Sequence, residues 1–428
     1  MRILIENGTV IDPQQSLDDI RNVYIDSNNI AAVLAPEDLS KAPFCRDEAD
    51  YVYDARGQII CPGLVDMHVH LREPGQEYKE TIETGCKSAA YGGFTDICCM
   101  PNTKPVNDNP EITTYIIEKA RSLGGTRVHP VAAISPGSSG KGLTEMGLIL
   151  DAGACAFSDD GQPVSDSQLM RRAMEYARSF DALIISHCED LRLAEGVMNE
   201  GIISTRMGLA GIPNAAETVM VMRDIALCEL TGARLHIAHV STAQSVDAIK
   251  HAKEKGLPVT AETAPHYFTL TDSAVLEYDT HAKMNPPLRT EIDREAIRNA
   301  LAEGVIDVIA TDHAPHSDLE KMVTFDQAAN GIIGLETSLP LGLKLVHDNV
   351  LTLSQLIEKM SINPTKIVRI PEKRISSGYP ADLTIIDLSK KHTISAKLFQ
   401  SKSRNTPFDG WTCMGKVMQT IVNGRLCL

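Results

Sequence analysis

The sequence of 428 residues lacks several features that would assign it to a membrane or secreted class. No run of 18 apolar residues occurs, and no basic stretch followed by an apolar one opens the chain, so we expect neither membrane insertion nor secretion. Its ten cysteines contain no Cys-x-x-Cys pair, and scattered, reduced thiols are typical of the cytoplasm. We therefore expect a cytoplasmic protein whose core needs no disulfide framework.

Positive charge is also scarce, because the formal net charge is −15 at pH 7. Such a charge repels nucleic acid and anionic membranes, so we expect no partner of either kind. A small anionic substrate is not excluded, but it would need local cationic groups and a metal ion to bind against this field. The hydrophobic content of 43% and the charged content of 23% are otherwise ordinary for a globular enzyme.

Short apolar runs recur eight times in the middle of the chain: GLVDMHVH, FTDICCM, RVHPVAAI, ACAFS, ALIISH, ARLHIAHV, LPVTAET and IDVIAT. Segments of helical period separate most of them. In SDSQLMRRAMEYARSF, for example, the residues on one helical face are Leu169, Ala173, Tyr176, Ala177 and Phe180. Apolar strands alternating with amphipathic helices indicate a parallel sheet covered on both faces, and eight such strands close a barrel. We predict a (β/α)₈ barrel over residues 58–374. A doubly wound open sheet is the alternative, but no Gly-x-Gly-x-x-Gly motif follows the first strand.

Both ends of the chain have the pattern of short strands joined by turns. ILIENGTVID and VYIDSNNIAAVL lie near the start, and ADLTIIDL and MQTIVNGRLCL lie near the end, with Asn-Gly and Asn-Asn as turn signals. We therefore predict that residues 1–57 and 375–428 meet in one small β-sandwich module.

Side chains that bind metals stand at or just beyond the ends of five predicted barrel strands. His68 and His70 close the first strand, and because they are two residues apart their side chains point the same way. The other strands contribute Asp159 and Asp160, then His187, His239 and Asp312. Active sites of such barrels lie at the C-terminal ends of the strands, so these groups should converge. Imidazole and carboxylate together suit zinc or a similar divalent ion.

A further histidine, His236, lies three residues before His239. This is an odd offset in a strand, so the two side chains should face opposite ways. We expect His236 to be structural and His239 to be the ligand.

An ordered set of motifs runs through the chain: DMHVHLREPG, CMPNTKPV, AFSDDGQPV, GIPNAAE, HIAHVST, APHYFTLTD, NPPLR, TDHAPH, GIIGLET and SKSRNTPFDGW. This set resembles the dihydroorotases of the amidohydrolase superfamily, and the match covers essentially the whole chain. The resemblance implies a hydrolase that interconverts N-carbamoyl-L-aspartate and L-dihydroorotate in pyrimidine biosynthesis.

The resemblance also implies a centre of one or two zinc ions held by histidine and aspartate: His68, His70 and Asp312 for one ion, His187 and His239 for the other. In many relatives a carboxylated lysine bridges the metals, but the stretch FSDDG contains no lysine. It is similar to a bacterial subtype in which the second aspartate, here Asp160, takes the bridging position. Asp159 is then expected to support the loop.

The substrate of this family carries an α-carboxylate. Arg72 follows the first metal motif and offers a planar fork for a carboxylate. The resemblance implies that Asn102 and His316 complete this clamp and that Asn285 contacts the ring. It also implies that Asp312 is the catalytic acid and base, which takes a proton from the attacking hydroxide and passes it to the departing nitrogen.

Two positions depart from the family pattern. Ala328-Ala329-Asn330-Gly331 stands where the family commonly has Ala-Pro-Phe-Gly, and loss of the proline predicts a less rigid substrate loop. Tyr267 replaces a histidine often seen after His266, so His266 is given no role.

Two other functions compete with this interpretation. An allantoinase or dihydropyrimidinase would usually use the bridging lysine, and its substrate would offer no carboxylate to Arg72 and Asn102. A non-catalytic barrel that scaffolds aspartate transcarbamoylase would typically have lost metal ligands, whereas here all six are present. We expect a small-molecule substrate and a homo-oligomer, with association with aspartate transcarbamoylase as an additional hypothesis.

Overall fold

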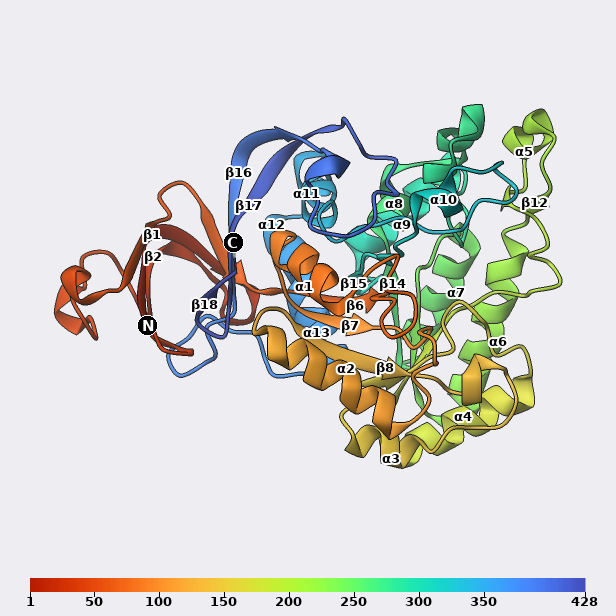
Figure 1. Ribbon diagram of the computed structural model, residues 1–428, viewed down its shortest axis with the longest axis horizontal. Coiled ribbons are helices and arrows are strands. Elements are labelled where there is room, and N and C mark those ends of the chain that lie inside the picture. The colour runs from red at the N-terminus through yellow and green to blue at the C-terminus, as the bar shows by residue number, and fades with distance from the viewer. Residues whose placement is uncertain (428) are drawn as a thin grey trace.

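Eight parallel strands stand in chain order in one half of the molecule, and the computed structural model describes residues 1–427 (Figure 1). These strands are β6 (Leu64–Val69), β7 (Phe94–Cys99), β8 (Arg127–Ala132), β9 (Ala156–Phe157), β10 (Leu183–Ser186), β13 (Arg234–Ile237), β14 (Val259–Thr263) and β15 (Val308–Ile309). A parallel bridge between Val69 and His313 joins the last strand to the first, and His70 N donates to His313 O at 2.9 Å. The sheet is therefore a closed barrel, as predicted, and not an open doubly wound sheet.

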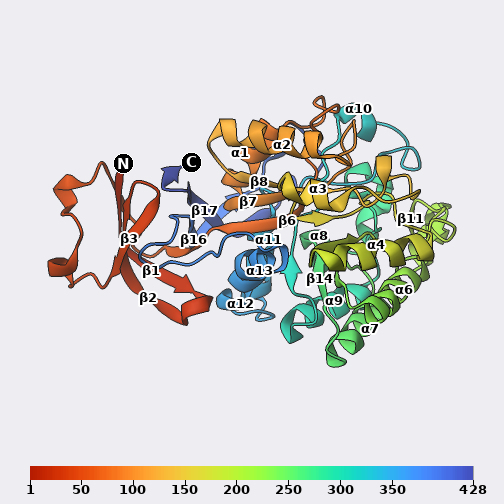
Figure 2. The ribbon, with the colours of Figure 1, turned by 90° about the horizontal axis from the view of Figure 1, so that it is seen from below.

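Helices follow the strands and cover the outside of the barrel (Figure 2). The longer ones are α1 (Ile82–Tyr91), α2 (Pro110–Leu123), α4 (Ser167–Ser179), α6 (Ala215–Thr231), α7 (Ala243–Glu254), α9 (Glu291–Glu303) and α11 (Ser338–His347). Shorter elements include α3 (Met146–Asp151), α5 (Ile202–Met207), α8 (Pro265–Thr269), α10 (Asp318–Lys321), α12 (Leu353–Ile357), α13 (Asn363–Val368), β11 (Met198–Asn199) and β12 (Gly211–Ile212).

Helix α4 shows how the local sequence sets these helices. Its N-cap Asp166 accepts hydrogen bonds from the backbone of Gln168 and Leu169, which satisfies two amides of the first turn. The buried face consists of Met170, Ala173, Met174 and Ala177. This face is turned by about one residue from the predicted one. Phe180 caps the helix and is 47% exposed, because apolar side chains occur on both sides of this segment and periodicity alone does not choose between them.

The two chain ends meet in a second sheet, as predicted. Its strands are β1 (Arg2–Asp12), β2 (Leu17–Asp26), β3 (Asn29–Leu34), β4 (Tyr51–Asp54), β5 (Ile59–Pro62), β16 (Leu383–Thr393), β17 (Thr412–Val422) and β18 (Arg425–Leu426). Strand β16 pairs with β5, while β1 pairs with β4 along its first half and with β5 along its second half. The sheet therefore divides at the middle of β1. The domain boundaries at residues 57 and 375 stay a prediction.

A buried ion-pair cluster joins this module to the barrel. Lys373 is 2% exposed, and its Nζ lies 2.5 Å from Asp96 Oδ2 and 2.7 Å from Asp382 Oδ2. Arg127, at the start of β8, contacts both carboxylates as well. Because the start of a barrel strand lies opposite the C-terminal rim, the cluster anchors the module away from that rim.

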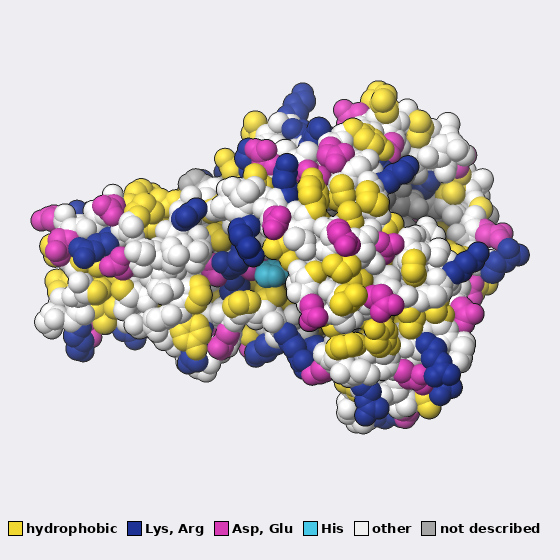
Figure 3. All heavy atoms as spheres, turned by 60° about the horizontal axis from the view of Figure 1, so that its bottom comes forward, with side chains coloured by type: hydrophobic (Ala, Val, Ile, Leu, Met, Phe, Trp, Pro, Cys, Tyr) yellow, Lys and Arg dark blue, Asp and Glu magenta, His cyan; other side chains and the backbone are white. Residues whose placement is uncertain are grey.

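The surface on the face shown in Figure 3 carries charges of both signs, and the helices of residues 1–427 lack the apolar character of a membrane span. On the face shown in Figure 3, acidic and basic side chains are intermixed with hydrophobic ones. Within residues 1–427, no helix combines the length and apolar character that crossing a bilayer requires.

Candidate active site

The side chains predicted to bind metal converge at the C-terminal rim of the barrel. His68 lies in β6 and His70 follows it, and the Nε2 atoms of both face Asp312 Oδ1, at 3.4 and 3.1 Å. The same two nitrogens face Asp160, at 3.4 Å from Oδ1 and Oδ2 respectively. The two histidines therefore point the same way, as their spacing predicts.

Asp160 lies between this group and a second pair of histidines. Its Oδ1 atom is 3.5 Å from His187 Nδ1 and 3.6 Å from His239 Nε2, while its Oδ2 atom faces His70. The two nitrogens of His187 and His239 are 2.7 Å apart. Asp160 therefore faces histidines of both groups, and a carboxylate in this position can bridge two cations.

This donor set fits a divalent metal ion. Two triads place their ligand atoms within 4.8 Å of one another: His68, His70 and Asp312, and then His68, Asp160 and His239. His68 Nε2 and Asp160 Oδ1 are buried and form no hydrogen bond within residues 1–427, and such buried polar atoms are costly unless something binds them. Burial opposes a charge on His68, but Asp160, Glu262 and Asp312 outweigh it and raise the pKa of His68 well above its usual value. The cluster therefore attracts positive charge.

Glu262 in β14 orients His68, the first of the predicted ligands, and this role was not predicted from the sequence. Its Oε1 atom lies 2.5 Å from His68 Nδ1, so Nδ1 donates to this carboxylate and Nε2 is the nitrogen left to bind a metal ion in place of its proton. Its Oε2 atom lies 3.3 Å from His236 Nε2, and His236 Nδ1 contacts Thr260 Oγ1 at 2.8 Å. His236 is thus packed behind the rim, in a structural position. The available signal was a carboxylate inside the apolar run LPVTAET.

Three residues of the rim have a left-handed backbone conformation, which residues other than glycine rarely adopt. Their φ angles are 62° at Arg72, 36° at His239 and 47° at Asp312. His239 lies beyond the end of β13, so the alternation of side chains along a strand does not set its direction. Such strained conformations persist where the surrounding structure imposes them, and they are common at functional sites.

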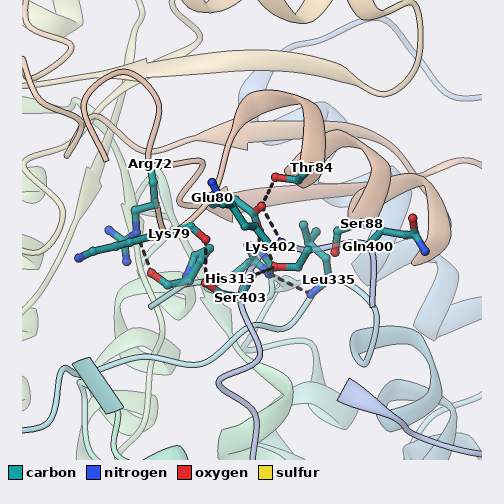
Figure 4. A network of polar contacts seen from close by, with 12 residues as sticks. Arg72, Lys79, Glu80, Thr84, Ser88, His313, Leu335, Gln400, Lys402 and Ser403 are labelled. Atoms are coloured by element: carbon teal, nitrogen blue, oxygen red, sulfur yellow. Dashed lines mark hydrogen bonds and ion pairs between the residues drawn. The ribbon is translucent and has the colours of Figure 1, made fainter. Parts of the chain in front are cut away.

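A buried network holds the backbone next to Asp312 (Figure 4). His313 Nδ1 accepts hydrogen bonds from the amides of Gly334 (3.1 Å) and Leu335 (3.4 Å), so its proton is on Nε2, 3.3 Å from Glu80 Oε2. Glu80 also accepts hydrogen bonds from Thr84 Oγ1, Ser401 Oγ and the Lys402 amide. Glu80 therefore links His313, the residue after Asp312 on the barrel rim, to the C-terminal segment at Ser401 and Lys402.

Asp159 points away from the cluster. Its Oδ1 atom accepts hydrogen bonds from the amides of Ile134 (2.8 Å) and Ser135 (3.1 Å), and its Oδ2 atom accepts one from the Ser135 hydroxyl. It therefore supports the loop that follows β8, whereas its neighbour Asp160 faces the histidines.

Two of the predicted substrate residues lie side by side. Arg72 Nε donates to Pro315 O at 3.2 Å, while its two terminal nitrogens make no hydrogen bond within residues 1–427. His316, the next residue, contacts Asn330 O through Nε2 at 2.8 Å. Burial, with Arg72 and Lys79 nearby, lowers the pKa of His316 to about 3, so its imidazole is neutral. The free fork of Arg72 is thus available to an anionic ligand.

The other two predicted substrate residues contact histidines of the cluster or their partners. Asn102 Oδ1 lies 2.8 Å from His70 Nδ1, so Asn102 orients that imidazole. Asn285 Nδ2 donates to Glu189 Oε1 at 2.9 Å, and Glu189 Oε2 lies 3.4 Å from His187 Nε2. Glu189 was not singled out from the sequence, although it lies only two residues after His187.

Solved structures share this architecture over nearly its whole length. An L-hydantoinase (dihydropyrimidinase) from Arthrobacter aurescens superposes with a TM-score of 0.88 at 26% identity, covering 99% of this chain and 95% of that one. Barrel and rim cluster together define a hydrolase of the amidohydrolase class. A family model described as dihydro-orotase-like matches residues 57–245. A dihydroorotase from Syntrophus aciditrophicus is 53% identical over 100% of this chain and 99% of its own length. A dihydroorotase from Desulfotalea psychrophila is 54% identical over 99% of both chains. The chain belongs to the dihydroorotase family.

Proposed function

We propose that this chain interconverts N-carbamoyl-L-aspartate and L-dihydroorotate with a centre of one or two zinc ions. The family membership supports the reaction, and the observation that carries the metal centre is the convergence of His68, His70, Asp160, His187, His239 and Asp312 on one rim. A zinc ion held by these side chains would supply a water of lowered pKa and would polarise the amide carbonyl.

Asp312 is the group that we assign to proton transfer. Its side chain is 12% exposed, compared with 0% for His68 and 4% for Asp160, so it is the ligand most open to a substrate. Burial disfavours its charge, but His68 and His70 outweigh burial and lower its pKa below the usual value. It is therefore a carboxylate at neutral pH. In ring opening it accepts a proton from the attacking water and delivers it to the departing nitrogen, and ring closure reverses both transfers.

Arg72 is the group that we assign to substrate choice. A charge-assisted hydrogen bond contributes about 1.5–3 kcal/mol, so Arg72→Ala should lower kcat/KM for dihydroorotate by about ten- to a hundredfold. Arg72→Lys should not restore it, because an ammonium group cannot reproduce the planar fork.

Metal content and activity on uncharged cyclic amides distinguish this role from a general loss of structure. Both should change little in the Arg72 variants, because the hydrogen bond of Arg72 within the described residues goes to Pro315 O and not to a proposed metal ligand. An Arg72→Ala enzyme that opens dihydroorotate as fast as the parent would contradict the assignment.

The likeness to hydantoinases supports a second candidate, a cyclic amidohydrolase that acts on rings without a carboxylate. The fork of Arg72 and the absence of a lysine in FSDDG favour dihydroorotate instead.

Assembly is a separate proposal. Light scattering of the chain, alone and mixed with aspartate transcarbamoylase, tests both a homo-oligomer and that association.

A further inference from the structure

Two lysines are buried close in the chain to residues assigned to the substrate, Asn285 and His316, and have no part in the chemistry above. Lys321, at the end of α10, is 2% exposed, and Lys283 is 4% exposed. Neither ammonium group forms an ion pair with a carboxylate of residues 1–427. An ammonium group is costly to bury, so its remaining partners must compensate for lost hydration.

Those partners are backbone carbonyls from two segments. Lys321 Nζ donates to Thr280 O (3.0 Å), Lys283 O (3.1 Å) and Ala329 O (2.7 Å), which uses all three donors of an ammonium group. Lys283 Nζ donates to Asp326 O (2.9 Å) and Ala328 O (2.8 Å). The two side chains thus fasten residues 280–283 to residues 326–329.

The loop that they hold is also restrained by hydrogen bonds of residues 329–331. The amide of Ala329 donates to Glu320 O at 3.1 Å, a hydrogen bond that proline could not make. The next residue, Asn330, offers its carbonyl to His316 Nε2, and the amide of Gly331 donates to Lys283 O at 3.0 Å. Hydrogen bonds to lysine and to backbone therefore restrain this loop.

We propose that Lys321 and Lys283 are positioning residues that set the substrate pocket. They fix the loop whose carbonyl orients His316, and they fix it against the segment that carries Asn285 two residues after Lys283. The proposal rests on the proposed function, because His316 and Asn285 are the substrate contacts assigned there.

The test is Lys321→Met, which keeps most of the apolar stem and removes the three donors. Misplacing the pocket walls should raise KM for dihydroorotate by about ten- to a hundredfold. The value of kcat should change by less than about threefold and metal content should not change, because loss of binding common to ground and transition states acts on KM alone.

Lys359→Met is the matched control. Lys359 is also buried, at 6% exposed, and its Nζ donates to Ile306 O at 2.7 Å, but it contacts neither segment of the pocket. Its loss should lower thermal stability and leave KM at the parental value.

Hydrogen exchange of the 326–331 amides provides a readout that does not depend on the substrate. Exchange should accelerate in Lys321→Met and stay parental in Lys359→Met. If Lys321→Met does not fold, Lys283→Met tests the same loop. Parental exchange and parental KM in a folded lysine variant would overturn the proposal. A parent enzyme that does not turn over dihydroorotate would instead overturn the proposed function, and the exchange result would remain valid.

Discussion

At the scale of single residues, the two neighbouring aspartates Asp159 and Asp160 have opposite surroundings. Asp160 faces four histidine nitrogens, whereas Asp159 binds loop amides. We predict that Asp160→Ala loses metal, measured by metal analysis of the purified protein, while Asp159→Ala loses less. Activity should not depend on added bicarbonate, because no lysine stands in the bridging position. A carbamate found on a lysine at this centre would rule out the assignment.

Glu262 leads to a second prediction at this scale. Because it holds the tautomer and orientation of His68, Glu262→Gln should weaken metal affinity by about 10–100-fold, measured by competition with a chelator. His236→Ala, on the far side of the same carboxylate, should keep the metal at some cost in stability. Loss of metal in the His236 variant together with full retention in Glu262→Gln would show that the two roles are reversed.

The residue scale also shows where prediction from sequence succeeds. His68 lies in β6 and His70 follows it directly, where the ladder to His313 continues, so the two side chains point the same way as their spacing predicts. The glutamates Glu262, Glu189 and Glu80 escaped notice because their importance depends on which imidazole nitrogen they face across the barrel, and a single sequence does not record that. The separation of His236 from His239 was expected, but strand alternation was the wrong reason, since His239 lies past the strand end.

At the scale of elements, the C-terminal segment completes the rim of a barrel that precedes it in the chain. Glu336, just before α11, is the clearest example: its Oε1 atom accepts hydrogen bonds from Ser88 Oγ (2.8 Å) and from the amides of Gln400 (2.8 Å) and Ser401 (3.2 Å). Burial raises the pKa of Glu336 to about 7 despite these bonds.

This raised pKa has a definite consequence for stability. Between about pH 4.5 and 7 the folded chain holds a proton on Glu336 that the unfolded chain releases, so this group lowers the free energy of unfolding as pH rises through that window. The free energy of unfolding of Glu336→Gln, relative to that of the parent, should therefore be larger at pH 8 than at pH 4.5. The increase should be at most about 3 kcal/mol, since one unit of pKa corresponds to about 1.4 kcal/mol.

The measurement is the difference in unfolding free energy between variant and parent at each pH, because effects common to both proteins cancel. A difference that is the same at pH 4.5 and pH 8 would show that burial does not disfavour the charge on Glu336.

At the scale of elements, the sequence pattern predicts the strands but not every helix face or loop restraint. The eight strands were predictable because each is a continuous apolar run, buried on both faces. The face of α4 was not, because Met170 and Met174 compete with Leu169 and Phe180 for the same period. The restraint on the 326–331 loop was also hidden, since it comes from lysines that ordinary composition would place on the surface.

At the scale of the whole molecule, one rim of the barrel carries both the histidine and aspartate cluster and the guanidinium group of Arg72. A net charge of −15 makes local cations necessary for an anionic substrate, and Arg72 and the proposed metal centre would provide them. The β module is anchored through Lys373 away from this rim, and the segment from Ser401 to Asn405 reaches it.

The most direct test of this account is ring opening by the purified chain with dihydroorotate, allantoin and dihydrouracil side by side, before and after removal of the metal. We expect efficient turnover of dihydroorotate, little turnover of the other two, loss of activity on chelation and recovery when zinc is added back. Turnover of dihydroorotate that survives complete removal of metal, or a metal-loaded enzyme that prefers either uncharged ring, would contradict it.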